Sequence, residues 1–271
     1  MNLLNKDING DKLAKILISK YSENRKTILD VGAGDGYLLR EITRTHHFNS
    51  FGIDPYITER NEENISLQSL SAEQITFLNR RFDLVYTVKS FHHFGIPDLF
   101  FREVEKSLSW EGKFIIVDWR NGAATGINER YYAVSEVKSM IEKTNLRIVE
   151  YGETSELFFI VGELKKRRIA VSTDDGGNIF PKMFGQAAHF DIYEFENGEF
   201  HFINRRENPY QKTLQHAKTI DVYKIVDDCQ ALLSARIGRT GVARLQDKGV
   251  RLIFDKGNIL KSLNNLLIFN R

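Results

Sequence analysis

Short apolar runs and amphipathic segments alternate along the first 163 residues of the chain. Runs rich in apolar and β-branched residues predict strands at 26–31, 50–54, 64–70, 82–88 and 112–119. Apolar residues at helical spacing predict helices at 11–21, 36–46, 72–78, 98–108 and 135–144. Because strands and helices alternate, we expect right-handed crossovers and a parallel sheet.

The last part of this region, residues 146–163, departs from the alternation. It contains two strand-like segments separated by a turn around Gly152, with no helix between them. Two strands joined in this way form a hairpin, which adds one antiparallel strand to the parallel sheet. A plain dinucleotide-binding dehydrogenase fold does not need this ending.

A second pattern begins at a basic run, residues 165–168. It predicts strands at 167–175, 230–237 and 250–254, a hairpin at 190–208 around Asn197-Gly198, helices at 211–227, 239–248 and 258–267, and a long loop at 176–190. We interpret residues 164–168 as a solvated linker. It separates a first domain, 1–163, from a second, smaller α/β domain, 169–271.

The composition is that of a soluble globular protein, with 42% hydrophobic and 27% charged residues. Its apolar stretches, such as 157–161, have the length of strands and are too short to span a membrane. The first residues are polar where a signal peptide is apolar, so we expect a cytoplasmic protein with no membrane partner. The net charge of +2 and the dispersed basic residues give no reason to expect nucleic acid as a partner.

The chain has one cysteine, Cys229. One cysteine excludes an internal disulfide framework and a zinc site built on several thiolates. It also excludes a three-cysteine iron–sulfur cluster of the kind that radical enzymes use to cleave S-adenosylmethionine. If this protein uses that cofactor, we therefore expect polar methyl transfer.

The most specific motif is ILDVGAGDGYLL at 28–39. A buried strand ends there, and Gly32, Gly34 and Gly36 lead into a helix whose first N–H groups are available to a ligand. Asp54 ends the next strand, 22 positions after Gly32, where an acid accepts hydrogen bonds from ribose hydroxyls. The spacing is G-x-G-x-G with Asp30 two positions earlier, unlike the G-x-G-x-x-G of dinucleotide sites.

At this point the sequence resembles the class I S-adenosylmethionine-dependent methyltransferases, in particular their small-molecule branch. The resemblance covers residues 10–163 and implies a Rossmann-like methyltransferase sheet, with S-adenosylmethionine as the cofactor. Asp30, Gly32, Ala33 and Gly34 match the motif that holds the methionine portion of the cofactor. Asp54 matches the acid that binds the ribose.

Three further segments match motifs of this family. Ala72 and Glu73 fall where the family contacts the adenine, although many members have an aspartate at the start of that stretch, where Ser71 stands here. Residues 82–94 match the strand whose end lines the methyl-transfer site, and there Lys89 is expected on the cofactor side. Residues 108–119 match the strand that follows the next helix.

Two histidines, His92 and His93, follow the strand at 82–88 and are the candidate catalytic residues. A general base is needed only when the acceptor has a proton to lose. The alternative is that they pack or cap a loop, since an adjacent pair cannot both point into one pocket. The Asn-Pro-Pro-Tyr signature of enzymes that methylate nucleic acid bases or glutamine is absent, and we expect a small-molecule acceptor.

Residues 167–268 resemble the dinitrogenase iron–molybdenum cofactor biosynthesis family, a ribonuclease-H-like α/β fold. The resemblance implies soft or imidazole ligation of an iron–sulfur-based cluster. The candidate ligands are Met183, His189, His216 and Cys229. The family often has histidine before its Phe-Gly pair, and here that position is Met183. The alternative for Cys229 is a buried structural residue.

These observations leave two main hypotheses for the function. The first is a cytoplasmic methyltransferase whose second domain binds substrate, a cluster-handling protein or a metal cluster. The second is a metallocluster carrier or scaffold whose first domain keeps the fold without transferring methyl groups. A third hypothesis is an interaction module with neither activity.

Overall fold

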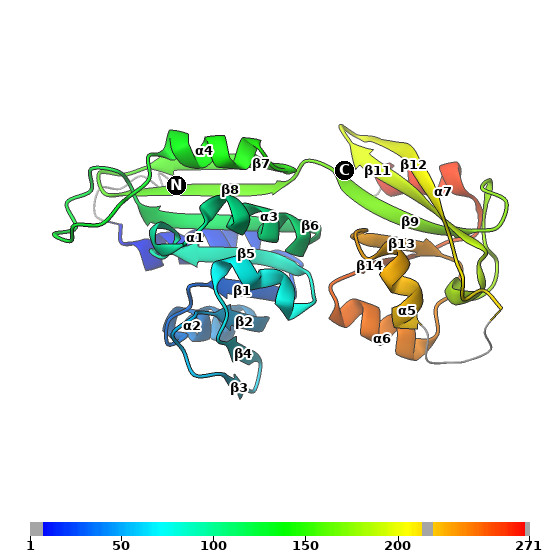
Figure 1. Ribbon diagram of the computed structural model, residues 1–271, viewed down its shortest axis with the longest axis horizontal. Helices are drawn as coiled ribbons and strands as arrows, with labels where there is room; N and C mark the ends of the chain where they lie inside the picture. Colours follow the sequence, from blue (N-terminus) through cyan, green and yellow to red (C-terminus); the bar gives the residue numbers. More distant parts are fainter. Residues whose placement is uncertain (1–7, 213–218, 269–271) are drawn as a thin grey trace. The chain divides into compact units, whose positions relative to one another are not determined.

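The computed structural model describes residues 8–212 and 219–268. The chain divides into two compact units, Met1–Lys165 and Lys166–Arg271. Each unit has its own sheet (Figure 1). Among the described residues, no helix is both long and apolar enough to cross a bilayer.

The first unit is built on an eight-stranded sheet with the order β3-β4-β2-β1-β5-β6-β8-β7. The strands are β1 (Thr27–Val31), β2 (Asn49–Ile53), β3 (Arg60–Glu62), β4 (Ile65–Gln68), β5 (Phe82–Val88), β6 (Leu108–Trp119), β7 (Leu146–Glu153) and β8 (Leu157–Leu164). From β4 to β6 neighbouring strands are parallel. β8 lies between β6 and β7 and is antiparallel to both. The predicted fold class, a mostly parallel sheet that ends in an antiparallel hairpin, is confirmed.

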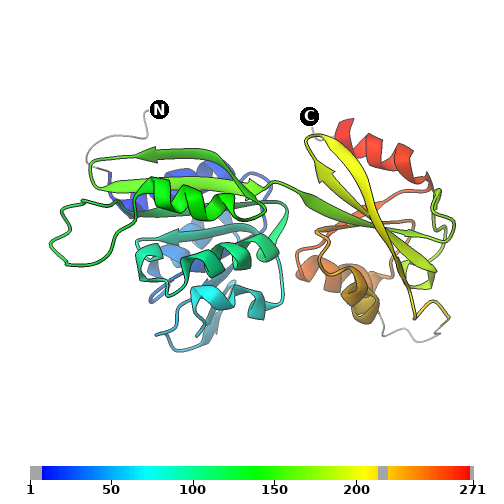
Figure 2. The same ribbon diagram turned by 45° about the horizontal axis from the view of Figure 1, so that its top comes forward.

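Helices cover both faces of this sheet (Figures 1 and 2). One apolar core contains side chains of α1 (Gly10–Tyr21) and α2 (Tyr37–His46). The other contains side chains of α3 (Pro97–Ser107), α4 (Val134–Glu142) and two short 3₁₀ helices, η1 (Ala72–Leu78) and η2 (Phe91–His93). Strands buried on both faces explain why their sequences are continuous apolar runs.

The second unit has a five-stranded sheet with the order β12-β11-β9-β13-β14. Its elements are β9 (Arg167–Thr173), β10 (Asn178–Ile179), η3 (Phe184–Gln186), β11 (His189–Glu196), β12 (Glu199–Glu207), α5 (Thr219–Tyr223), η4 (Lys224–Val226), β13 (Ala231–Ser234), α6 (Arg239–Asp247), β14 (Arg251–Phe254), β15 (Gly257–Asn258) and α7 (Ile259–Ile268). β9, β13 and β14 are parallel, whereas β11 and β12 form the predicted antiparallel hairpin. This confirms a second, smaller α/β unit.

The basic run at 165–168 is less solvated than the sequence suggested. β8 extends to Leu164 and β9 begins at Arg167, so two residues lie between the strands. Lys165 Nζ donates to the Thr144 carbonyl at 2.9 Å. Arg168 forms ion pairs with Glu194 at 3.2 Å and Asp228 at 3.0 Å. Carboxylates and carbonyls that are distant in sequence thus bind the charges, which a reading of local composition does not reveal.

We predict that Gly162→Ala destabilises the first unit. Gly162 of β8 is opposite Phe114 of β6, and an added Cβ would lie 2.3 Å from the Phe114 ring and 2.7 Å from the Arg147 carbonyl oxygen. Overpacking of this kind costs about 1–3 kcal/mol of unfolding free energy. Urea unfolding followed by tryptophan fluorescence reports this unit, since Trp110 and Trp119 both lie in it.

Gly95→Ala is the matched control, because the nearest atom to its added Cβ is 3.6 Å away. Equal unfolding free energies for Gly162→Ala and Gly95→Ala would contradict the packing described here.

Candidate functional site

The loop between β1 and α2 is built by glycines in the left-handed region. Gly32, Gly34 and Gly36 have φ values of 78°, 52° and 79°, a conformation that favours glycine. A Cβ on Gly32 would lie 2.5 Å from Ser90 Cβ, and one on Gly36 would lie 3.0 Å from Leu67 Cδ1. These two glycines are therefore required by contacts with the ends of β5 and β4.

Gly34 differs from its two neighbours because no atom lies within 4 Å of the position that a Cβ would take. Its backbone is exposed at the tip of the loop. The loop is anchored beneath it, since Gly32 N and Ala33 N both donate to the Ile53 carbonyl, at 2.8 and 3.0 Å. The loop therefore presents an open stretch of backbone that a ligand can approach closely.

Asp54 follows β2 and lies beside this loop. Its Oδ2 accepts a hydrogen bond from Gly34 N at 3.1 Å, and its Oδ1 accepts one from Tyr56 N at 2.9 Å. The carboxylate is half-buried. The structure thus brings together Asp54 and the glycine loop.

Asp30, the last acid before the loop, is buried at the end of β1. Its Oδ2 accepts a hydrogen bond of 2.7 Å from the Tyr86 hydroxyl of β5. Burial, together with the nearby carboxylates of Asp54 and Asp11, raises the pKa of Asp30 to about 7, against the lowering effect of this hydrogen bond. This carboxyl would be stabilised as an anion by a cation placed beside it. Tyr86 carried no sequence signal for this role, because it sits within an apolar strand.

The other predicted cofactor residues also have partners within the first unit. Lys89, at φ 53° after β5, places its Nζ 3.2 Å from Asp11 of α1 and 5.7 Å from the centre of the Trp119 ring. Ala72 is buried at the start of η1. Glu73 accepts a hydrogen bond of 2.9 Å from Ile96 N. Burial opposes ionisation of Glu73, but hydrogen bonds from Ile96, Ser71 and other donors lower its pKa.

The two histidines lie in η2, directly after β5. Asp118, fully buried near the end of β6, accepts hydrogen bonds from His92 N at 2.9 Å and from His92 Nδ1 at 2.8 Å. His92 Nε2 lies 3.4 Å from Glu129 Oε2, in the loop after β6. Burial lowers the pKa of His92, but Asp118 and Glu129 outweigh it and raise this pKa.

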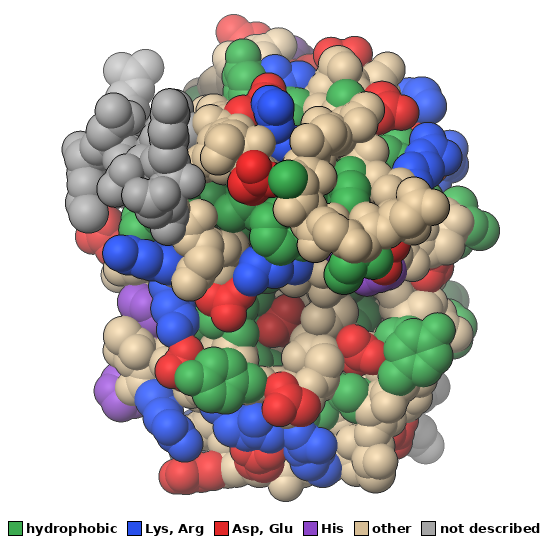
Figure 3. All heavy atoms as spheres, turned by 90° about the vertical axis from the view of Figure 1, so that its left-hand side faces the viewer, with side chains coloured by type: hydrophobic (Ala, Val, Ile, Leu, Met, Phe, Trp, Pro, Cys, Tyr) green, Lys and Arg blue, Asp and Glu red, His purple; other side chains and the backbone are tan. Residues whose placement is uncertain are grey.

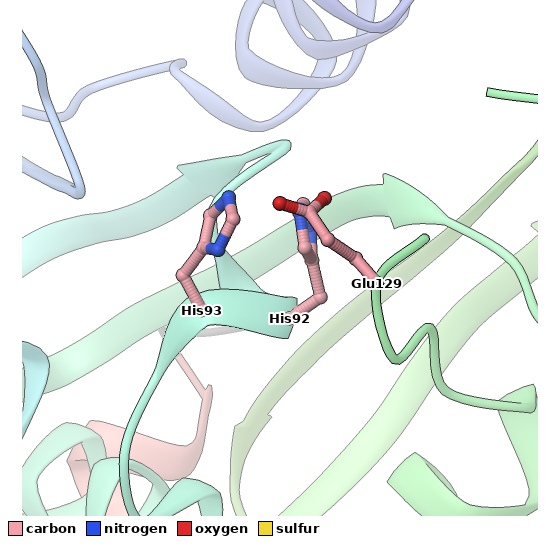
Figure 4. A group of neighbouring side chains, drawn as sticks. All are labelled: His92, His93 and Glu129. Carbon is pink, nitrogen blue, oxygen red and sulfur yellow. The ribbon is translucent and has the colours of Figure 1, made fainter. Parts of the chain in front are cut away.

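His93 lies beside His92, with the two ring centres 3.9 Å apart. Figure 4 shows both rings on the same side of η2, with the Glu129 carboxylate next to His92. An adjacent pair was not expected to point into one pocket, yet here the two rings pack against each other on one side of η2. Asp118 and Glu129 were missed from sequence. Asp118 could have been identified as the single acid near the end of an apolar strand. Glu129 lies in a loop, and nothing in its local sequence distinguishes it.

Two candidate metal ligands of the second unit, His189 and Cys229, do not share one site. His189 opens β11 opposite Thr173, the last residue of β9. Cys229 is buried in the apolar core and precedes Gln230, whose N–H donates to the carbonyl of Arg168 at the beginning of β9. His189 and Cys229 are therefore at opposite ends of β9, which corrects the expectation of a site that uses both. His216 lies outside the described residues.

On the face drawn in Figure 3, basic, acidic and hydrophobic side chains alternate over short distances. The side chains visible there form no extended basic surface of the kind that binds the phosphates of nucleic acid.

Comparison with known proteins gives matches to both units. The family model described as "Methyltransferase domain" matches residues 6–151, and the one described as "Dinitrogenase iron-molybdenum cofactor" matches residues 165–267. The uncharacterized methyltransferase YcgJ of Bacillus subtilis (strain 168) is 25% identical over 119 residues, which are 40% of this chain and 47% of that protein. The chain thus spans about half the length of this curated relative.

Two solved structures also resemble the chain. One is the Burkholderia thailandensis 1,6-didemethyltoxoflavin-N1-methyltransferase with 1,6-didemethyltoxoflavin and S-adenosylhomocysteine bound, at 14% identity and a TM-score of 0.49, covering 58% of this chain and 79% of that one. The other is an S-adenosylmethionine-dependent methyltransferase from Clostridium acetobutylicum ATCC 824, at 15% identity and a TM-score of 0.48, covering 58% and 93%.

The raised pKa of Asp30 predicts a pH-dependent stability. The pKa of Asp30 is higher in the folded state than in the unfolded state, so protonation of Asp30 stabilises the fold. This contribution to the unfolding free energy is fully present below the unfolded pKa of about 3.9 and is lost as pH rises through about 7. The loss is on the order of 4 kcal/mol. Asp30→Asn, which cannot ionise, should gain unfolding free energy relative to wild type at pH 8 and much less at pH 5.

Urea unfolding at the two pH values measures this difference. If the difference in unfolding free energy between wild type and Asp30→Asn is the same at pH 5 and pH 8, the raised pKa of Asp30 is contradicted.

Proposed function

We propose a function from one premise: the chain belongs to the methyltransferase-domain family. The first unit binds S-adenosylmethionine and transfers its methyl group to a small-molecule acceptor. The observation that carries the proposal is the open, left-handed Gly34 backbone between a buried carboxyl, Asp30, and an acid at the end of the next strand, Asp54.

The residues present fit this cofactor. S-adenosylmethionine is cationic at its sulfur and its amino group, and Asp30 is a buried carboxyl whose ionised form a nearby cation would stabilise. The backbone of Gly32, Ala33 and Gly34 would hold the methionine portion, and Asp54 would accept hydrogen bonds from the ribose. Ala72 and Glu73 would border the adenine.

Lys89 would line the side of the site that holds the cofactor.

When bound, the cofactor supplies a methyl group on a charged sulfur, which is already a good leaving group. The protein then has to align the acceptor with that methyl group and exclude water. His92 and His93 follow β5, where the acceptor is expected, and Asp118 fixes the orientation of the His92 ring. The two histidines would contact the acceptor and hold its proton where it has one to lose.

We propose that the second unit binds a metal cluster or a protein that handles such clusters. The support is its match to the dinitrogenase iron-molybdenum cofactor model and a buried His189 Nδ1 for which the described residues offer no hydrogen-bond partner. The same observations favour the second candidate function, a metallocluster carrier. Iron and sulfide analysis of anaerobically purified wild type and His189→Ala tests it, and a cluster content that the substitution leaves unchanged counts against this site.

We predict that Gly34→Ala weakens S-adenosylmethionine binding. The added methyl group would occupy the open space at the loop and disfavour its left-handed backbone. Isothermal titration calorimetry should show micromolar binding to wild type and a loss of about tenfold or more in the variant, equivalent to at least about 1.4 kcal/mol.

Gly198→Ala is the matched control. Gly198 also has a positive φ, 89°, with no atom within 4 Å of an added Cβ, but it lies in the second unit. Unchanged binding by Gly34→Ala, or equal losses in both variants, would contradict the proposed site; no binding to wild type would contradict the proposed function.

A further inference from the structure

The described residues contain one three-residue group with the ligands and spacing of a metal site. It consists of His92, His93 and Glu129, whose ligand atoms all lie within 4.8 Å of one another. Two imidazoles and one carboxylate are the protein ligands of one class of catalytic zinc sites and of non-haem Fe(II) oxygenases. Figure 4 shows the three side chains converging.

The contacts of His92 match those of a metal ligand. Its Nδ1 lies 2.8 Å from Asp118 Oδ1, which leaves Nε2 to face Glu129 at 3.4 Å. Ligating histidines almost always donate their other ring N–H to a carboxylate or carbonyl, which fixes the ring and its tautomer. Asp118 is itself held in place, because it also accepts hydrogen bonds from the N–H groups of His92 at 2.9 Å and Trp119 at 2.7 Å.

The other two residues of the group, His93 and Glu129, leave the site open to solvent. His93 and Glu129 are exposed, whereas the His92 side chain is 4% exposed. Glu129 is also positioned, since its Oε2 accepts a hydrogen bond of 3.0 Å from the Tyr131 hydroxyl. A buried, oriented imidazole next to two exposed ligands gives a site that an ion can enter from solvent and in which it keeps coordination positions for other molecules.

We propose that His92 Nε2, His93 and Glu129 bind a divalent transition-metal ion of the class that prefers imidazole, such as Zn²⁺ or Fe²⁺. Three protein ligands leave room for water or a small molecule. With the ion bound, the two histidines act as its ligands and do not accept the acceptor's proton, which leaves to solvent. This site also suggests the class of acceptor, an inference that rests on the proposed methyl transfer. The acceptor would be a small molecule whose hydroxyl or thiol group binds the ion. The charge of the ion lowers the pKa of the bound hydroxyl or thiol.

The test is titration of the metal-free full chain with Co²⁺, a spectroscopic substitute, followed by visible absorption. We expect wild type to bind one Co²⁺ with an imidazole–carboxylate spectrum. His93→Ala and Glu129→Gln should each lower the affinity by about tenfold or more, as loss of even an outer-shell partner does. Both side chains are exposed, so the variants should fold, which thermal unfolding checks.

Two control variants locate the ion. His46 and His47 form the other adjacent histidine pair of the sequence, and His47→Asn keeps a residue that tolerates its φ of 55°. This variant and His201→Ala, which alters an exposed histidine of β12 in the second unit, should bind Co²⁺ like wild type. Loss of the spectrum in either control, a thiolate charge-transfer band from Cys229, unchanged affinity in His93→Ala and Glu129→Gln, or no Co²⁺ binding to wild type would overturn the proposal.

A parallel titration of the metal-free wild type with S-adenosylmethionine separates this inference from the proposed function. If the protein binds S-adenosylmethionine but not Co²⁺, only the proposed metal site is contradicted. Co²⁺ binding without donor binding removes the methyltransferase proposal and leaves the metal site in place.

Discussion

The first unit depends on the tight turn between β1 and α2. Gly32 packs against Ser90 after β5, and Gly36 packs against Leu67 of β4. Larger side chains at either position would separate the loop from the strands that it touches. The turn therefore holds the ends of β1, β4 and β5 together, and it does so with a backbone conformation that glycine adopts at little cost.

This packing explains why the site residues come from several strands. Asp30 ends β1, Asp54 follows β2, Lys89 and the two histidines follow β5, and Asp118 lies near the end of β6. Since these strands are parallel, their carboxyl ends meet at one edge of the sheet, which is where ligands bind in open α/β folds. Acids that are distant in sequence thus become neighbours. One of them, Asp30, is left in surroundings that favour its neutral form.

The sequence was informative wherever burial dictates the pattern. The strands β5, β6 and β8 are apolar because they are covered on both faces. The predicted range 82–88 coincides with β5, whereas β6 begins at Leu108 rather than at 112. The turn predicted around Gly152 is wrong, because Gly152 lies within β7 and the turn is at 154–156. β3 (Arg60–Glu62) was not predicted, because a short polar strand at the edge of a sheet has no apolar pattern. The glycine loop and Asp54 were identified because a ligand-binding turn requires these residue types at this spacing.

What could not be predicted were contacts between residues far apart in the chain. Glu129 reaches His92 only through the loop after β6, and nothing in its local sequence marks it. In the second unit, His189 and Cys229 are residues of the right type but lie at opposite ends of β9, so the two do not share one site. Residue type indicates which chemistry is available, and the topology decides which groups meet.

The central claim is that the bend after β1 holds a sulfonium nucleoside. The most direct measurement is a crystal structure of the full chain with S-adenosylhomocysteine. We expect the ribose hydroxyls on Asp54 and the amino-acid end of the ligand against Gly32–Gly34, near Asp30. Density for the ligand elsewhere, or a nicotinamide dinucleotide that occupies the bend in its place under competition, would contradict the account.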